Sequence, residues 1–215
     1  MAKETVLVLG AHNDDPIFGA GGTLAKYAKQ GHRIKTVIFS YGEMSHPHLK
    51  PEIIKKQRYK ESIAADKVIG GRGVQYLGVK DGMFLLEFSN KKIKKKIKDI
   101  IKKEKPSKIF THGINDHHQD HFAVYKLMQE IISEMKLKCD IYSFDVWNII
   151  KIFKRNRPRL IVDVTKTFDT KIRAIKAHKS QINTMVSIGW TVYLKAILNG
   201  RNNNCKYAEI FDKIN

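Results

Sequence analysis

The chain has 215 residues, of which 40 are Lys or Arg and 21 are Asp or Glu, so that its formal charge is +19 and its pI is near 9.8. This length is sufficient for one α/β domain with a substantial core, without help from disulfides or a structural metal. The two cysteines, Cys139 and Cys205, are far apart and match neither a disulfide framework nor a metal-binding spacing, which predicts two reduced thiols.

The amino-terminal segment MAKETVLVLG is too short and too polar to be a signal peptide. No uninterrupted apolar run approaches the roughly 20 residues that a membrane-spanning helix needs. We therefore expect a cytoplasmic protein.

The densest positive charge lies in residues 90–105, NKKIKKKIKDIIKKEK. The isoleucines of this run recur at helical spacing, which predicts an amphipathic helix with a solvated lysine face. The run has no interleaved aromatic residues on which the bases of a single strand would stack. We therefore do not expect a nucleic acid as the partner, although the charge would attract anionic substrates and acidic membrane surfaces.

Segments typical of strands and of helices alternate along the chain. The first helix has Pro16 in its first turn and Gly31 just past its end, which is the usual placement of these two residues. The expected order is strand 5–10, helix 16–30, strand 33–40, helix 51–70, strand 73–78, helix 90–105, strand 107–112, helix 120–135, strands 139–147 and 159–164, and helix 165–182.

Such alternation predicts an α/β fold of the Rossmann-like kind, with a mostly parallel sheet and helices on both faces. No Ser/Gly-rich linker and no internal repeat divides the chain, so residues 1–215 are expected to form one domain. The tail at 201–211 is less regular, and we expect it to fold over a site or to lie at an interface.

Two short polar clusters carry the chemistry of the chain. They are AHNDD at 11–15 and NDHHQDH at 115–121, and each follows an apolar strand-like run. Each cluster should therefore lie on the loop that leaves the carboxyl end of a strand, where open α/β sheets bind ligands. The spacing of His118 and His121 places both on one face of a helix that begins there.

These clusters supply the imidazoles and carboxylates of a catalytic zinc site. Two histidines and one aspartate around an open fourth position are typical of catalytic zinc, whereas structural zinc takes four protein ligands, usually with cysteine. An open position lets zinc lower the pKa of bound water toward roughly 7, which favours hydrolysis. Either cluster alone is more typical of a helix cap, but two clusters at strand ends favour a metal site.

Two other catalytic or binding patterns are excluded. The glycines of GAGGT at 19–23 do not match the spacing of a dinucleotide-binding loop, and no phosphate-binding lysine follows them, so close packing of a helix on the sheet explains them better. No GxSxG motif is present, so a serine hydrolase has no obvious nucleophile.

The motifs resemble those of the PIG-L/LmbE-like zinc-dependent N-deacetylases. That family has AHPDDE, then GGT, and later HxDH, where this chain has AHNDD, GAGGT and HQDH. Further features of the family occur in the same order across most of the chain: YGE at 41–43, Arg58 with Glu61, LGVKDG at 77–82, HKSQ at 178–181 and YAEIF at 207–211.

The resemblance implies a role for particular residues. His12, Asp15 and His121 would bind Zn²⁺ or another divalent transition metal such as Fe²⁺, and Asp14 would be the general base. His118 would be the electrophile or general acid, with Asp120 setting its tautomer and charge. Substrate contacts would come from Arg58 and Asp81. Three further residues would be cleft groups or would lie behind the ligands: His117, His178 and Glu209.

Two positions depart from the family pattern. Asn13 stands where proline is common, and Pro16 stands where the family has glutamate. That glutamate is not among the positions matched to the metal or the base, so the resemblance still implies removal of an acetyl group from an N-acetylated amino sugar. The alternatives are a hydrolase of another amide or ester and a non-catalytic binder of acidic glycans, lipid head groups or nucleic acid. A homo-oligomer also remains open.

Overall fold

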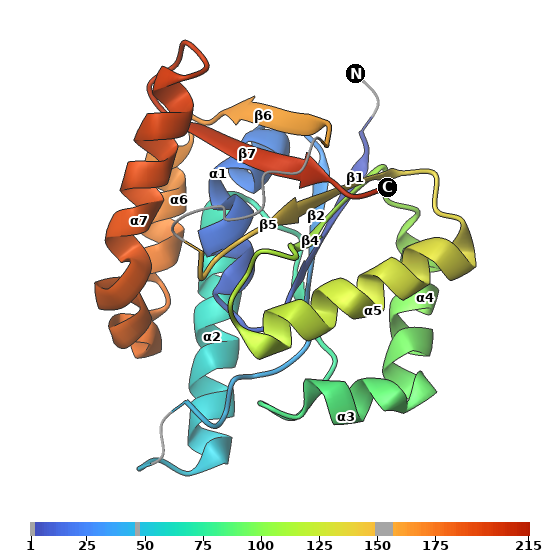
Figure 1. Cartoon of the computed structure of the whole chain (residues 1–215). Coiled ribbons are helices and arrows are strands. Elements are labelled where there is room, and N and C mark those ends of the chain that lie inside the picture. Colours follow the sequence, from blue (N-terminus) through green and yellow to red (C-terminus); the bar gives the residue numbers. More distant parts are fainter. Residues whose placement is uncertain (1–2, 46–47, 149–156) are drawn as a thin grey trace.

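The computed structural model describes residues 3–45, 48–148 and 157–215, apart from the side chain of Asn183. Seven strands form one sheet in the order β3-β2-β1-β4-β5-β7-β6 (Figure 1). The strands are β1 (Thr5–Gly10), β2 (Arg33–Ile38), β3 (Val74–Tyr76), β4 (Lys108–His112), β5 (Asp140–Phe144), β6 (Arg159–Asp163) and β7 (Ala208–Lys213). The strands pair in parallel except for β7, which is antiparallel to both β5 and β6.

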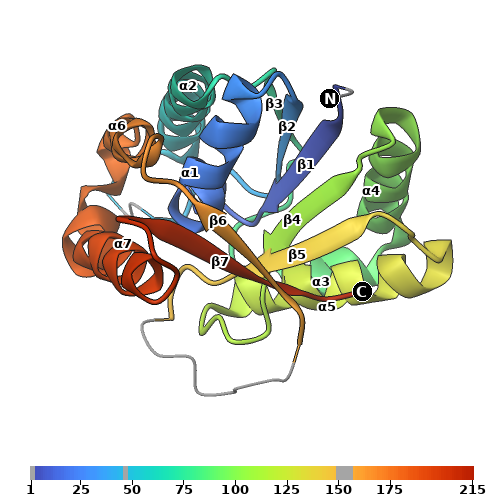
Figure 2. The same ribbon diagram turned by 90° about the horizontal axis from the view of Figure 1, so that it is seen from above.

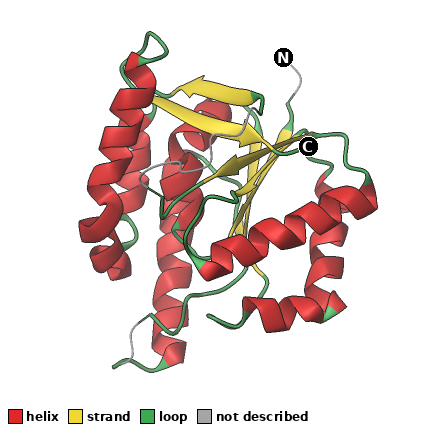
Figure 3. Ribbon diagram, in the orientation of Figure 1, coloured by secondary structure: helices red, strands yellow, loops and turns green. Residues whose placement is uncertain are grey.

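Helices cover both faces of the sheet (Figures 2 and 3). The helices α1, α2, α6 and α7 lie on one face, and α3, α4 and α5 lie on the other. Their bounds are α1 (Asp15–Lys29), α2 (Pro51–Ile69), α3 (Phe84–Ser89), α4 (Lys91–Glu104), α5 (Gln119–Met135), α6 (Phe168–Lys176) and α7 (Ile182–Arg201), with a 3₁₀ turn at Lys179–Gln181. The predicted fold class is confirmed.

The core has two layers, one on each face of the sheet. In β1, Val6 and Val8 pack into one apolar cluster, whereas Leu7 and Leu9 pack into the other. Successive side chains of a strand point to opposite faces, so a strand buried on both faces is apolar throughout. This explains why TVLVLG has no polar alternation.

The lysine-rich segment forms α4, as its spacing predicts. Ile93, Ile97, Ile100 and Ile101 are buried, and most of the lysines of the helix are exposed. Lys94 forms ion pairs with two glutamates of α5. The lysines of this helix therefore form a solvated face, and part of their charge is paired with the glutamates of α5. No helix in the described part of the chain is long and apolar enough to cross a membrane.

The carboxyl-terminal part differs from the prediction. The helix expected at 165–182 is the shorter α6 followed by a 3₁₀ turn, and the unpredicted α7 follows. The tail does not fold over a site, because Ala208–Lys213 is a strand inserted between β5 and β6. Its Phe211 side chain is fully buried and packs edge-on against Phe110 of β4.

Glu209 of β7 connects the tail to α1. Its carboxylate accepts hydrogen bonds from the backbone N–H groups of Gly22 (3.2 Å) and Thr23 (2.7 Å) and from Nζ of Lys171 (2.6 Å). A Cβ atom at Gly22 would lie only 3.2 Å from Glu209 Oε1. The glycines of GAGGT therefore serve close packing. Glu209 does not line the cavity at the polar clusters, and its contacts are structural.

We predict that Glu209→Ala destabilises the protein by about 3–5 kcal/mol, because it leaves the buried Lys171 ammonium without its carboxylate. Urea unfolding followed by circular dichroism measures this change. The double variant Lys171→Met/Glu209→Leu, which removes both charges, should lose less stability than Glu209→Ala. A change within about 0.5 kcal/mol for Glu209→Ala, the range of an ordinary surface substitution, would contradict the assignment.

Candidate metal centre and active site

The two polar clusters meet at the point where the strand order reverses. From β1 the chain passes to β2 and β3 on one side, and it then returns to β4 on the other side of β1. Because β1 and β4 are parallel neighbours, the loops at their carboxyl ends lie side by side. This is the crevice in which open α/β sheets bind ligands.

The first cluster joins β1 to α1. The backbone N–H of His12 donates to Asp15 Oδ2 at 2.7 Å, and Asp15 is the first residue of α1. Pro16 lies in the first turn of that helix, where its missing N–H needs no partner. A Cβ at Gly10 would come within 2.6 Å of the Pro16 ring. The proline that replaces the family's glutamate therefore fits this helix start.

The second cluster joins β4 to α5. His118 caps α5, because its Nδ1 accepts the backbone N–H of Asp120 at 3.2 Å. The imidazole of His121, in the first turn, stacks on that of His118 with ring centroids 4.5 Å apart. Both histidines thus lie on one side of the helix start, as their spacing predicts.

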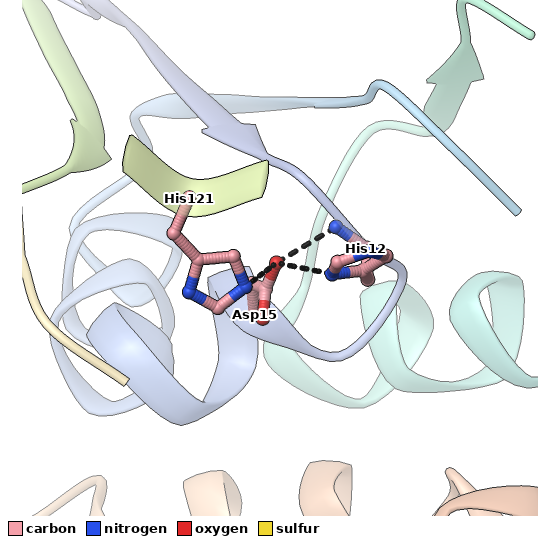
Figure 4. Close-up of side chains that lie close together, drawn as sticks. All are labelled: His12, Asp15 and His121. Carbon is pink, nitrogen blue, oxygen red and sulfur yellow. Dashed lines mark hydrogen bonds and ion pairs between the residues drawn. The ribbon is translucent and has the colours of Figure 1, made fainter. Parts of the chain in front are cut away.

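The imidazoles of His12 and His121 converge on one carboxylate oxygen of Asp15 (Figure 4). Asp15 Oδ2 lies 3.5 Å from His12 Nδ1 and 3.2 Å from His121 Nε2. The potential ligand atoms of these three residues all lie within 4.8 Å of one another. His121 Nε2 is buried and makes no hydrogen bond, although it faces the carboxylate. An orphaned imidazole nitrogen beside a carboxylate and a second imidazole fits a transition-metal site.

The two adjacent carboxylates differ in their electrostatic surroundings. Burial and the charge of Asp15 raise the pKa of Asp14 above its usual value. Burial also acts to raise the pKa of Asp15, but His121 and His112 hold it well below its usual range. Opposite shifts in two neighbouring carboxyl groups are typical of a pair with separate roles, one as a proton acceptor and one as a permanent anion.

Asp116 lies behind His121, and the sequence analysis did not single it out. Its Oδ1 is 3.0 Å from His121 Nδ1, and its Oδ2 accepts the backbone N–H of Val146 at 2.7 Å. Burial acts to raise the pKa of Asp116, but His121 lowers it to about 2. A carboxylate held in this way fixes the orientation of the His121 imidazole, so that its Nε2 points toward Asp15.

We predict that Asp116→Asn weakens metal affinity by about 10-fold to 100-fold, the usual effect of removing a carboxylate behind a histidine ligand. Competition with a chromogenic chelator measures this affinity. The matched control is Asp169→Asn, the same change at an exposed position of α6. Equal affinities for the Asp116 variant and the unaltered protein would show that Asp116 does not support the ligand.

His112, the last residue of β4, is the other residue that the sequence analysis missed. Its Nε2 accepts the backbone N–H of Ala11 at 2.9 Å and lies 3.2 Å from Asp15 Oδ2. Burial lowers the pKa of His112 to about 4, so the imidazole is neutral near pH 7. Its ring stacks on His121 with centroids 4.0 Å apart, so His112 supports the position of the His121 imidazole.

Asp81 and Asp120 lie on the other side of His12. His12 Nε2 is 3.1 Å from Asp81 Oδ1 and 3.4 Å from Asp120 Oδ2. Asp120 was expected to set the tautomer and charge of His118. Its backbone N–H donates to His118 Nδ1, and its carboxylate faces His12. Asp81 was expected to contact substrate; its carboxylate pairs with His12 and accepts the N–H of Met44.

Arg58 of α2 enters the site beneath the loop at 41–43. The guanidinium is buried and donates to the carbonyl oxygen of Tyr41 at 3.2 Å. Its charge lowers the pKa of Asp14, against the effects of burial and Asp15. Gly42 has φ +65°, and a Cβ there would lie 1.6 Å from Arg58 Nη1. Gly42 is therefore favoured here for two reasons: its positive φ, and the Arg58 guanidinium that occupies the space a Cβ would need.

The HKSQ segment anchors the loop that carries the aspartates. The side-chain amide of Asn13 lies 3.1 Å from Nδ1 of His178, whose pKa burial lowers to about 4. Glu61 of α2 accepts the backbone N–H of Ser180 at 2.8 Å. Asn13, where the family has proline, thus makes a contact that proline could not make. His117 is exposed and is not part of this arrangement.

The converging residues open into a cavity of about 360 Å³. It is lined by Asp14, Asp15, His12, His118, Asp120, Asp81, Gly82, Arg58, Met44, Ser45, Trp147, Gln181 and Thr184. His121 and Asp116 lie behind this surface. A second cavity of about 260 Å³ between α1 and α7 contains none of the histidines.

The fold and the site define an α/β protein with a candidate metal centre at the switch point of its sheet. The sequence profile of the family described as "PIG-L: GlcNAc-PI de-N-acetylase" matches residues 7–132, more than half of the chain, and both polar clusters lie within the match. The chain belongs to this family.

Individual relatives agree with this assignment. A probable N-acetyl-alpha-D-glucosaminyl L-malate deacetylase of Bacillus cereus is 29% identical over 196 residues, which cover 84% of this chain and 85% of the relative. The structure of N,N'-diacetylchitobiose deacetylase from Pyrococcus horikoshii superposes with a TM-score of 0.81 at 21% identity, over 98% of this chain and 84% of that one.

A structure with a different named activity is equally similar in fold. GalB of Pseudomonas putida, a 4-carboxy-2-hydroxymuconate hydratase, gives a TM-score of 0.81 at 20% identity, over 99% of this chain and 96% of that one. The shared architecture therefore does not by itself fix the reaction, which depends on the side chains of the site.

Proposed function

We propose that this chain is a metal-dependent N-deacetylase that hydrolyses the acetamide of an N-acetylated amino sugar to acetate and a free amine. One observation carries the proposal: Asp14, with its raised pKa, lines the same cavity as His12 and Asp15, and these two residues cluster with His121, which lies behind the cavity surface. The named activities of the Bacillus and Pyrococcus relatives support the choice of substrate. We further propose that residues 1–215 act as one catalytic domain.

The proposed metal is zinc, held by His12, Asp15 and His121. Two imidazoles and one carboxylate suit catalytic zinc, and the same donor set also suits Fe²⁺. Asp15 and Asp116 raise the pKa of His121 to about 9 against the effect of burial, so a cation bound there displaces a proton. When bound, zinc supplies a lowered pKa for a coordinated water and polarisation of the substrate carbonyl.

Asp14 and His118 have separate roles in the proposed reaction. Asp14 accepts a proton from the attacking water, a role for which a raised pKa is suited. His118 accepts a hydrogen bond at Nδ1, so its neutral ring carries the proton at Nε2. That N–H donates to the carbonyl oxygen as negative charge develops there. Asp14, which has taken up the proton of the water, then delivers this proton to the departing amine.

Two further residues position the substrate in this proposal. Arg58 lines the cavity beside Asp14 and presents its guanidinium to the hydroxyl groups of the sugar. Asp81 also lines the cavity, but its contact with His12 Nε2 indicates that it orients this ligand as well.

A panel of N-acetylated sugars, incubated with zinc-loaded protein and assayed for both acetate and free amine, tests the function. Equal amounts of acetate and amine from at least one sugar are expected. Bound zinc without acetate from any member would favour another hydrolase or a hydratase. Absence of metal together with salt-sensitive binding to polyanions would favour a non-catalytic binder.

A further inference from the structure

The outer face of α7 is apolar. Six of its side chains recur at helical spacing and are open to solvent: Ile182 (59% exposed), Val186 (74%), Trp190 (54%), Tyr193 (45%), Leu194 (40%) and Leu198 (48%). The opposite side of the same helix is buried in the core through Ile188, Val192 and Ala196. A helix on the surface of a globular protein normally presents polar residues to water. This outer face, a contiguous apolar patch, is typical of an interaction surface.

Among the described elements, α7 lies at the edge of the molecule, with one side against the sheet (Figures 1 and 2). Trp190 and Tyr193 stand in the middle of the outer face. The indole N–H of Trp190 donates to the carbonyl oxygen of Ser187 at 3.1 Å. The polar group of this ring is therefore satisfied within the helix, so the ring can enter an apolar medium without losing a hydrogen bond.

Positive charge predominates around this face, although Asp169 at the start of α6 is also exposed. No Asp or Glu occurs from residue 170 to residue 208, whereas this stretch contains seven Lys or Arg residues. Lys171 is buried against Glu209. Five others are exposed on α6, on α7 or beside them: Arg173, Lys176, Lys179, Arg201 and Lys206. The surface thus combines exposed apolar and aromatic side chains with flanking cations.

We propose that the α7 outer face, the six side chains named above, docks on an anionic lipid bilayer. Apolar and aromatic side chains on one side of a helix, with cations at its flanks, fit the boundary between acyl chains and anionic head groups. A second copy of the chain fits less well. Two such faces would bring together mostly cations, and each copy carries a formal charge of +19.

Vesicle binding tests the proposal with the intact protein. In the Trp147→Phe background Trp190 is the sole tryptophan. We expect this protein to sediment with vesicles of phosphatidylcholine and phosphatidylglycerol, with a blue shift of Trp190 fluorescence, and to bind pure phosphatidylcholine vesicles far more weakly. Val186→Asp/Leu194→Asp should lower partitioning by about tenfold or more. Two apolar side chains that would enter the bilayer are replaced by negative charges that the anionic lipid repels.

The matched control is Leu85→Asp/Leu86→Asp on α3, where the side chains are 66% and 65% exposed but lie outside the α7 outer face. It should bind vesicles like the unaltered protein, and thermal unfolding should show that both double variants remain folded. The proposal is wrong if anionic vesicles do not bind the protein, or if the two double variants lose binding equally. Concentration-dependent self-association that Val186→Asp/Leu194→Asp abolishes, without vesicle binding, would assign the face to a second copy instead.

Discussion

Asp14→Asn is expected to bind the metal normally and to lose about 100-fold to 10,000-fold in kcat, the range that a general base supplies. The amide is close in size to the carboxylate but cannot accept a proton from water near neutral pH. Asp14 is not one of the three residues whose donor atoms converge, so the metal site should remain intact. Acetate release under saturating substrate measures the loss, and metal analysis of the same sample verifies occupancy.

Asp169→Asn is again the matched control, because it makes the same change on an exposed part of α6 and should leave kcat unaltered. Unchanged acetate release by Asp14→Asn would remove Asp14 from the role of base. Loss of metal from that variant would instead indicate that Asp14 belongs to the binding site.

His121→Ala is expected to lose both metal and activity. His121 is fully buried, and its Nε2 makes no hydrogen bond within the protein, so this nitrogen is available to bind a metal ion. Alanine removes one of three donors and leaves two residues on a single loop, His12 and Asp15, which do not enclose a cation. The metal content of the purified variant and the rise in Tm on addition of zinc both measure the effect.

The unaltered protein should gain about 2.7 kcal/mol of stability at a zinc concentration 100 times its Kd, whereas His121→Ala should gain almost nothing. His117→Ala is the control, since this exposed histidine precedes α5 on the same segment. Its metal content and Tm shift should match those of the unaltered protein. Retention of zinc by His121→Ala would contradict its assignment as a ligand.

Most of the amino-terminal half of the fold could be predicted because its local signals agree, although the short helix α3 was not expected. Apolar runs mark buried strands, and Pro16 and Gly31 lie at the two ends of α1 as expected. The carboxyl-terminal part was harder to predict because α7 is apolar on its outer face as well as its inner face, so the usual helical pattern is blurred. The strand character of β7 depends on pairing with two strands that are remote in sequence.

The candidate site shows the same division. The two clusters could be predicted to meet because each follows a strand, and strand ends in a parallel sheet share one edge. Asp116 and His112 could not be singled out, because their roles come from tertiary contacts with His121 and Asp15 that no spacing encodes. A histidine at the end of β4 and an acidic residue beside HHQDH were the available signals.

The position of a bound metal tests the central claim most directly. An anomalous difference map, recorded at the zinc edge from a crystal grown with zinc, should show one strong peak per chain. We predict a peak about 2.0–2.2 Å from one nitrogen of His12, one nitrogen of His121 and one carboxylate oxygen of Asp15. A map without a peak among these three side chains, or with zinc held elsewhere in the chain, would contradict the account.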